Sequence, residues 1–344
     1  MNHLRFFSVA LLAVAGLCAQ DSRLSGISAR AHCGTGATAL TTGFVIGPGS
    51  DQTLLIRAIG PTLEVAGAMA DPVLTLFNSS FAVVATNDNW LTRDATAFST
   101  AGASPLPTGS SDAAIVTTLA PGSYTAQVNA SDDTAGLAQI EIFALGSGAS
   151  LLNTSTRFSV GPGTAPAMGL VVSPGTHTRR LLIRASGPAL APFGLTGILA
   201  DPTLRVTRAN ETTTLATNDH WSSPADSRAA STQQLQDAFT QAGAFVFPAP
   251  SKDSALLLDL APGHYSIHVG SVDDAPGLTL VEVYDLTATA LSVTTTSEAA
   301  GPAERGRTSR TGSGFGVWGR CERRGTATWG ARHQVMAPPL ARRQ

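Results

Sequence analysis

The residues best suited to ligand chemistry form a short polar cluster that the chain carries twice, at 86–90 and 217–221. Each cluster has an asparagine followed by an aspartate, and a tryptophan two residues later. Side-chain oxygens at such close spacing can ligate calcium, and an aspartate that precedes a later strand could add a carboxylate. The candidate ligands are Asn87, Asp88 and Asp112 in the first copy and Asn218, Asp219 and Asp253 in the second.

The same residue types also build turns without a metal. In an Asx-type turn the side-chain oxygens accept hydrogen bonds from the local backbone. The second cluster has His220 where the first has Asn89, which weakens the case for an oxygen cage common to both copies. Calcium binding is therefore one hypothesis and a metal-free turn is the other.

Trp90 and Trp221 also support two interpretations. An aromatic ring on an exposed loop can stack on a sugar, which would make the tryptophans a carbohydrate-binding platform. A tryptophan that follows a strand can instead close the end of a hydrophobic core. Because both copies retain this residue, the structural role is favoured.

Arg57 and Arg184 lie inside apolar segments that read as strands. A buried arginine requires a carboxylate partner, because an unpaired buried charge is strongly destabilising. Asp71 and Asp201 are the candidate partners, although each also suits the start of a strand after a turn.

Catalytic motifs are absent from the sequence. It has no G-x-S-x-G elbow, no H-E-x-x-H pair and no glycine-rich phosphate loop that ends in Gly-Lys. The histidines of the two copies have no histidine at the matching position of the other copy: His32, His177, His220, His264 and His268. A protein without enzymatic activity is therefore expected, and a secreted hydrolase is the alternative.

Charge divides the chain into two parts. Before residue 287, 13 basic and 21 acidic side chains give a net charge of −8, which would repel nucleic-acid phosphates. From residue 287 onward, nine arginines against three glutamates give +6. This segment lacks strand alternation, so 287–344 is predicted to be a disordered basic tail. A degraded third repeat that begins at 291–301 is the alternative.

The two polar clusters belong to a tandem duplication that covers most of the chain. Matching segments occur in the same order in both copies, and the offset between them grows from about 127 to 141 residues. They include LLIRAIGP and LLIRASGP, ADPVLTLF and ADPTLRVT, ATNDNW and ATNDHW, and LAPGSYTAQV and LAPGHYSIHV. The predicted repeats span 24–145 and 152–286, and each is long enough to bury its own core.

Within each copy the pattern is that of β-strands. Apolar and polar residues alternate over 123–128 and again over 264–269, which predicts a sheet with one buried face. Ala-Pro-Gly at 120–122 and 261–263 supplies turns before these strands. Many short strands with little helix predict an all-β protein of two tandem β-sandwich domains, arranged like jelly rolls, with minor short helices.

One helix is predicted at 231–243. A Ser231/Gln234 capping box begins it, Gly243 ends it, and Leu235 and Phe239 share one face. Its counterpart at 94–102 is shorter, so this segment is expected to be a surface excursion outside the core. Short helices are also expected after each Gly-Pro, at 62–66 and 189–193.

The N-terminus is typical of a secretory signal peptide. Arg5 precedes an apolar run at 6–17, and small residues follow, so 1–19 is predicted to be removed. Lipidation of Cys18 is the alternative. No segment is long and apolar enough for a transmembrane span. Cys33 and Cys321 remain, and unpaired thiols are favoured over a bridge between them.

The stretch from LTLFNSSFAVVATNDNW through LAPGSYTAQV to LAQIEIFAL resembles the bacterial pre-peptidase C-terminal domain. That resemblance covers about the last two thirds of each repeat, and it implies a small jelly roll of exported proteins that in some members binds calcium. The opening portion of each copy, with SAR at 28–30 and STR at 155–157, resembles tandem repeats in large exported proteins of environmental bacteria.

Together these features predict a secreted or cell-surface protein with a structural or adhesive role. The alternative is a carbohydrate-binding module, assisted by calcium, and an uncharacterised hydrolase is a second alternative. The expected partners are extracellular polysaccharides or cell-surface components. The sequence specifies no oligomeric state.

Overall fold

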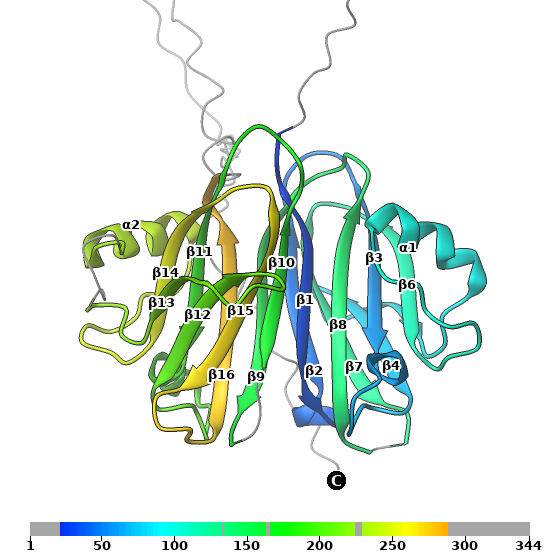
Figure 1. The fold of residues 1–344 in the computed structure, drawn as a ribbon, viewed down its shortest axis with the longest axis horizontal. Helices are drawn as coiled ribbons and strands as arrows, with labels where there is room; N and C mark the ends of the chain where they lie inside the picture. Colours follow the sequence, from blue (N-terminus) through cyan, green and yellow to red (C-terminus); the bar gives the residue numbers. More distant parts are fainter. Residues whose placement is uncertain (1–20, 133, 163–165, 224–228, 288–344) are drawn as a thin grey trace, which may run out of the picture.

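The computed structural model describes residues 21–132, 134–162, 166–223 and 229–287. The predicted signal peptide lies outside these residues, as does the predicted tail apart from Thr287. Figure 1 shows the two repeats side by side, with one helix at each outer flank.

The first repeat contributes the strands β1 (Leu24–Cys33), β2 (Leu40–Ile46), β3 (Gln52–Ile59), β4 (Pro72–Asn78), β5 (Val83–Asn87), β6 (Ala113–Leu119), β7 (Gly122–Ala130) and β8 (Gly136–Leu145). Its helices are α1 (Ala95–Ala101) and the 3-10 turns η1 (Gly36–Thr38), η2 (Pro61–Leu63) and η3 (Thr92–Asp94).

The second repeat contributes β9 (Leu151–Val160), β10 (Ala167–Val172), β11 (Arg179–Ser186), β12 (Pro202–Arg208), β13 (Thr214–Asn218), β14 (Ser254–Leu260), β15 (Gly263–Ser271) and β16 (Gly277–Asp285). Its helices are α2 (Thr232–Ala242) and η4 (Pro188–Phe193). Thus both helical segments expected after Gly-Pro are present, as η2 and η4.

Each repeat folds into two facing layers of four antiparallel strands. In the first repeat the layers have the orders β1-β8-β3-β6 and β2-β7-β4-β5. The second repeat has the same orders in its own strands, β9-β16-β11-β14 and β10-β15-β12-β13. This is the strand order of a jelly roll, so the predicted all-β sandwich is confirmed.

The repeats share both sheets. Strand β1 pairs with β10 and strand β2 pairs with β9, which joins the four-stranded layers into two sheets of eight strands. Sheet A is β13-β12-β15-β10-β1-β8-β3-β6, and sheet B is β14-β11-β16-β9-β2-β7-β4-β5. Exchanging the repeats converts one strand order into the other, so the halves are related by a pseudo-two-fold axis.

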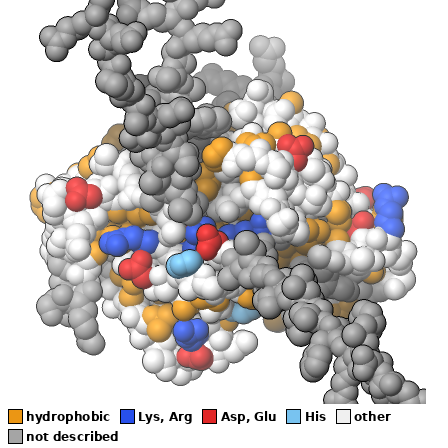
Figure 2. Space-filling model, turned by 90° about the horizontal axis from the view of Figure 1, so that it is seen from above, with side chains coloured by type: hydrophobic (Ala, Val, Ile, Leu, Met, Phe, Trp, Pro, Cys, Tyr) orange, Lys and Arg blue, Asp and Glu red, His pale blue; other side chains and the backbone are white. Residues whose placement is uncertain are grey.

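The space between the sheets holds one hydrophobic cluster that runs through both repeats, which we call the main core. It joins Ile27 and Phe44 of the first repeat to Phe158 and Met168 of the second, all of them buried. The register follows from alternation, because the polar residues of these strands fall on the outer faces. Figure 2 shows charged side chains of both signs scattered over the face seen from above, among uncharged and apolar surface.

The helices cover part of the outer faces and bury a second layer of apolar residues. Helix α2 begins at the predicted cap, where Ser231 accepts from the Gln234 backbone N–H at 3.2 Å, and ends at Gly243. Leu235 and Phe239 pack with Trp221 against sheet B, and Phe98 of α1 packs with Trp90 against sheet A. The expectation that these segments lie outside any core is therefore wrong, because each closes a small core of its own.

The shared main core predicts that both repeats unfold together. Met168 on β10 is fully buried at the junction, and Met168→Ala should lower the free energy of unfolding by about 2–5 kcal/mol. Urea unfolding should show one transition that shifts as a whole. Val116→Ala, at a side chain 41% exposed on edge strand β6, is the control and should shift it little. Two separate transitions in either variant would contradict a common core.

Candidate functional site

The asparagine of each polar cluster bridges two strands. The Oδ1 atom of Asn87 accepts from the backbone N–H of Ala114 at 2.9 Å, and its Nδ2 donates to the Asn89 carbonyl at 2.9 Å. Asn218 forms the same pair of bonds, to Ala255 N–H at 2.9 Å and the His220 carbonyl at 3.2 Å. These contacts tie the end of β5 to β6, and the end of β13 to β14.

The buried aspartates hold the loops that follow Gly-Pro. Asp112 accepts from the Gly60 backbone N–H at 2.9 Å and from the Thr62 hydroxyl. Asp253 accepts from the backbone N–H groups of Gly187 at 2.6 Å and Ala189 at 3.2 Å. A carboxylate in this position satisfies donors that the short helices η2 and η4 leave unpaired at their first turn.

The remaining candidate ligands point elsewhere. Asp88 and Asp219 are exposed, and the Asp219 carboxylate lies 3.4 Å from Nδ1 of the neighbouring His220. Within the described residues, no three His, Cys, Asp or Glu side chains gather as a metal site would require. The contacts of Asn87, Asp112, Asn218 and Asp253 match the turn interpretation; calcium binding at these loops stays a prediction.

Replacing Asp112 separates the two hypotheses. Asp112→Ala leaves the Gly60 N–H buried without an acceptor, so the free energy of unfolding should fall by about 1–3 kcal/mol, with or without calcium. Asp88→Ala, at an exposed carboxylate, should change it little. A melting temperature of the unmodified chain that rises in excess calcium and falls with chelator would instead support a metal.

Both tryptophans are buried, which contradicts their role as a sugar-binding platform. Trp221 is 0% exposed and Trp90 is 9% exposed, so neither ring offers a face to a sugar. Trp221 packs on Phe239 of α2 with ring centroids 5.3 Å apart, and its indole N–H donates to the Pro248 carbonyl at 3.0 Å. The indole N–H of Trp90 donates to the Pro107 carbonyl at 3.1 Å. Each tryptophan therefore closes a core beneath a helix.

The buried arginine of β3 pairs with a glutamate, not with the predicted aspartate. Nε and Nη2 of Arg57 lie 2.8 and 2.5 Å from Oε2 of Glu141 on β8, and Nη1 donates to the Ser104 carbonyl at 2.6 Å. Asp71 accepts from the Ser131 hydroxyl instead, and Asp201 pairs with Lys252 at 2.6 Å. The partner was missed because Glu141 alternates with isoleucines, which suggests a solvated face, whereas α1 covers that face.

In the second copy, aromatic rings surround the buried guanidinium of Arg184. Arg184 Nε lies 3.4 Å from Oε2 of Glu282, and the guanidinium nitrogens have no hydrogen-bond partner among the described residues. Its central carbon instead lies 4.7, 4.4 and 4.0 Å from the ring centroids of Phe239, Phe245 and Phe247. Cation–π attraction to three rings thus takes the place of the hydrogen bonds that Arg57 makes, whereas Arg57 itself lies near one ring, 5.0 Å from the Phe98 centroid.

Removing one partner of the first pair should be costly. Glu141→Leu leaves the Arg57 guanidinium buried without its carboxylate, and the free energy of unfolding should fall by about 3–5 kcal/mol. The double variant Arg57→Met/Glu141→Leu buries no charge and should recover most of that loss in urea unfolding. If the double variant is as unstable as the single one, packing and not charge pairing dominates at this position.

Two other chemically reactive groups, Cys33 and His177, do not have the surroundings of a catalytic residue. Burial raises the pKa of the Cys33 thiol to about 11, so it stays protonated at neutral pH. Nδ1 of His177 faces both Asp21, at 2.8 Å, and Thr176, at 2.9 Å. A catalytic triad uses the two nitrogens of its histidine for different partners, which this exposed trio does not.

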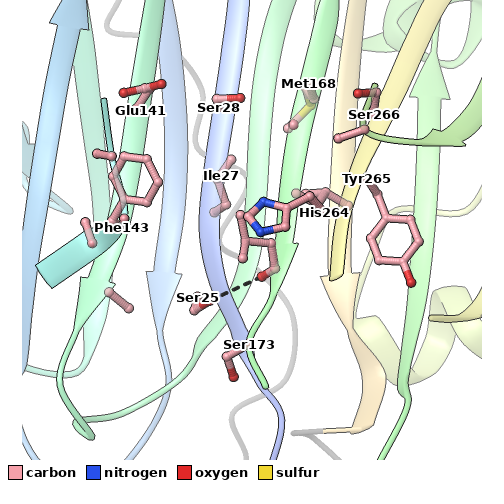
Figure 3. A pocket seen from close by; sticks show the side chains of 18 of the residues that line it. Ser25, Ile27, Ser28, Glu141, Phe143, Met168, Ser173, His264, Tyr265 and Ser266 are labelled. Atoms are coloured by element: carbon pink, nitrogen blue, oxygen red, sulfur yellow. Dashed lines mark hydrogen bonds between the residues drawn. The ribbon is translucent and has the colours of Figure 1, made fainter. Parts of the chain in front are cut away.

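A groove of about 760 Å³ crosses the outer face of sheet A where the repeats meet. Its floor is formed by outward-facing residues of β1, β10 and β15, and its lining also includes the segment after α1, Phe143 and Asn210. Figure 3 shows Ser28, Phe143, His264 and Ser266 around it. Ser28, Gly169 and Ser266 stand in register across the floor, so the three strands carry small groups at that level. Sequence patterning missed this groove, because its parts come from both copies.

Among the described residues, no helix is long and apolar enough to cross a membrane. No protein-family model matches the chain. No curated protein matches it either.

Two solved structures show a weak likeness. A presumed secreted protein from Eubacterium rectale is 12% identical, covers 74% of this chain and 72% of its own, and superposes with a TM-score of 0.20. The major capsid protein P2 of bacteriophage PM2 is 10% identical, covers 74% of this chain and 97% of its own, and has a TM-score of 0.19. Scores at this level identify neither a family nor an activity.

Proposed function

We propose that this chain is a secreted or cell-surface protein with a structural or adhesive role and no catalytic activity. The observation that carries the proposal is the use of the polar residues that both copies retain. The asparagines that bridge two strands, the buried aspartates and the arginine–glutamate pairs all contact backbone or side-chain groups of their own repeat. What the duplication preserved is a scaffold.

The architecture suits such a role. Two jelly rolls that share their sheets and main core form one body, with both inner sheet edges paired. A body of this kind can present a binding face without rearranging. The jelly-roll order also agrees with the proposed kinship to the pre-peptidase C-terminal domain, although no family model identifies it.

Retention under flow tests the adhesive role. Beads that carry the full chain should be held on layers of purified extracellular polysaccharide or on bacterial cells more strongly than beads that carry an inert protein of similar charge. In parallel, chromogenic ester, peptide and glycoside substrates should show no turnover. Turnover that scales with protein concentration, or retention no better than that of the inert protein, would contradict the proposal.

A further inference from the structure

The groove at the repeat junction carries positive charge that the fold does not use. Arg30 on β1 lines it, is exposed, and forms no ion pair with any described residue. Arg30 begins a row of paired residues that runs across neighbouring strands of sheet A. The row continues through Ala167 of β10 and His268 of β15 to Arg205 of β12. The acidic side chain that lines the groove, Glu141, is held by Arg57.

A second histidine stands further along β15. His264 lies four residues from His268 on the same outward-facing side of the strand, and its ring projects toward the middle of the groove in Figure 3. Between the two histidines, the hydroxyls of Ser266 and Ser28 flank Gly169. A Cβ atom at Gly169 would lie 2.4 Å from the Ser28 hydroxyl oxygen, so glycine keeps this part of the floor low.

The pseudo-two-fold axis provides an internal comparison. Arg30 of β1 is matched by another arginine, Arg157 of β9, so it does not distinguish the sheets. The positions of sheet B that match Arg205, His264 and His268 are Thr75, Ser123 and Gln127. All three counterparts are uncharged, yet they occupy the same strands of the same fold. The jelly roll therefore does not require these basic side chains, and their accumulation on one face of the molecule needs another explanation.

The electrostatics of this row favour an anion. The pKa of His268 is lowered by burial and then by the nearby Arg205 charge, so these two groups lie within electrostatic reach of each other. An anionic group bound beside Arg205 would offset that charge. Acidic residues elsewhere on the chain act weakly here, because the Debye length is about 8 Å at physiological salt.

The spacing indicates a ligand with repeated charges. The Cα atoms of Arg30 and His268 are two strand spacings apart, or about 10 Å, and Arg205 is one spacing further. One small anion suits such a row poorly, whereas an extended chain with an acidic group at intervals can follow it. Duplex DNA carries a charge per about 1.7 Å, which is far denser than the spacing of these basic side chains.

From these observations we infer that the outer face of sheet A binds an acidic polysaccharide through carboxylate or sulfate groups. The polymer would contact Arg30 and His264 in the groove and continue beyond the groove over His268 and Arg205. Serine hydroxyls and exposed backbone on the floor would bind the sugar hydroxyls between these charges. The inference rests on the proposed adhesive function and gives it a ligand class. In this proposal the carbohydrate-binding surface is a face built by both repeats, and the buried tryptophans take no part in it.

The test compares two triple variants of the full chain. Arg205→Ala/His264→Ala/His268→Ala removes three basic groups of the proposed site on sheet A and keeps Arg30. Thr75→Ala/Ser123→Ala/Gln127→Ala removes the counterparts of these three residues on sheet B. The probes are polygalacturonate, dextran sulfate and neutral dextran, and each is titrated into the unmodified chain and both variants. The melting temperatures of the two variants are measured first and should be equal. The basic residues after position 287 contribute equally to both variants.

The sheet A variant should bind the acidic probes about tenfold more weakly, as expected when charge-assisted hydrogen bonds are lost, and the sheet B variant should bind like the unmodified chain. Preference between polygalacturonate and dextran sulfate identifies carboxylate or sulfate as the recognised group. Equal binding by both variants, equal binding of neutral dextran, or tighter binding of single-stranded DNA would overturn the inference.

The same variants separate this inference from the adhesive role. If beads with the sheet A variant are retained under flow as well as the unmodified chain, adhesion stands and the groove is not its site. If the unmodified chain binds acidic polysaccharide through the groove but is not retained under flow, the site stands and the adhesive role fails.

Discussion

Two strand pairings, β1 with β10 and β2 with β9, are the constraint on which the rest of this structure depends. A sandwich of four-stranded layers exposes unpaired backbone at its edges, and such edges invite association with other strands. Here each repeat covers the inner edges of the other, which makes two long sheets and one continuous main core. The groove at the junction exists only because this pairing brings β1 beside β10 and β15.

A second feature is the layer of side chains outside each sheet. Strand β3 is apolar on both faces, since Leu54 and Ile56 enter the main core while Leu55 packs beneath α1. Arg57 belongs to that outer layer, which explains how a charged residue persists in an otherwise apolar strand. The two copies then differ in how they satisfy it, with hydrogen bonds to Glu141 and Ser104 in one and three phenylalanines in the other.

Local features of the fold were predictable from sequence, because short-range chemistry determines them. Alternation at 123–128, the turns at 120–122 and the Ser231 cap all depend on residues within a few positions of one another. The partner of Arg57 was not predictable, because it depends on where α1 folds back. A core-closing role was favoured for Trp221, but the helix that covers it was not predictable, because that depends on where α2 folds back. The sharing of sheets was not predictable for another reason. Because the two copies have equivalent strands, the sequence cannot show whether an edge strand pairs within its own repeat or with the other repeat.

The pseudo-two-fold relation between the halves gives a single chain the geometry of a symmetric dimer. Contacts in which each of two like units offers the same edge to the other are those of a symmetric homodimer. The pairing of β1 with β10, repeated as β9 with β2, has that form inside a single chain. The short linker at 146–150 makes the encounter of the two halves intramolecular, so it does not depend on protein concentration. Because the two halves have separate sequences, each face can carry residues that its counterpart lacks, which identical subunits cannot do.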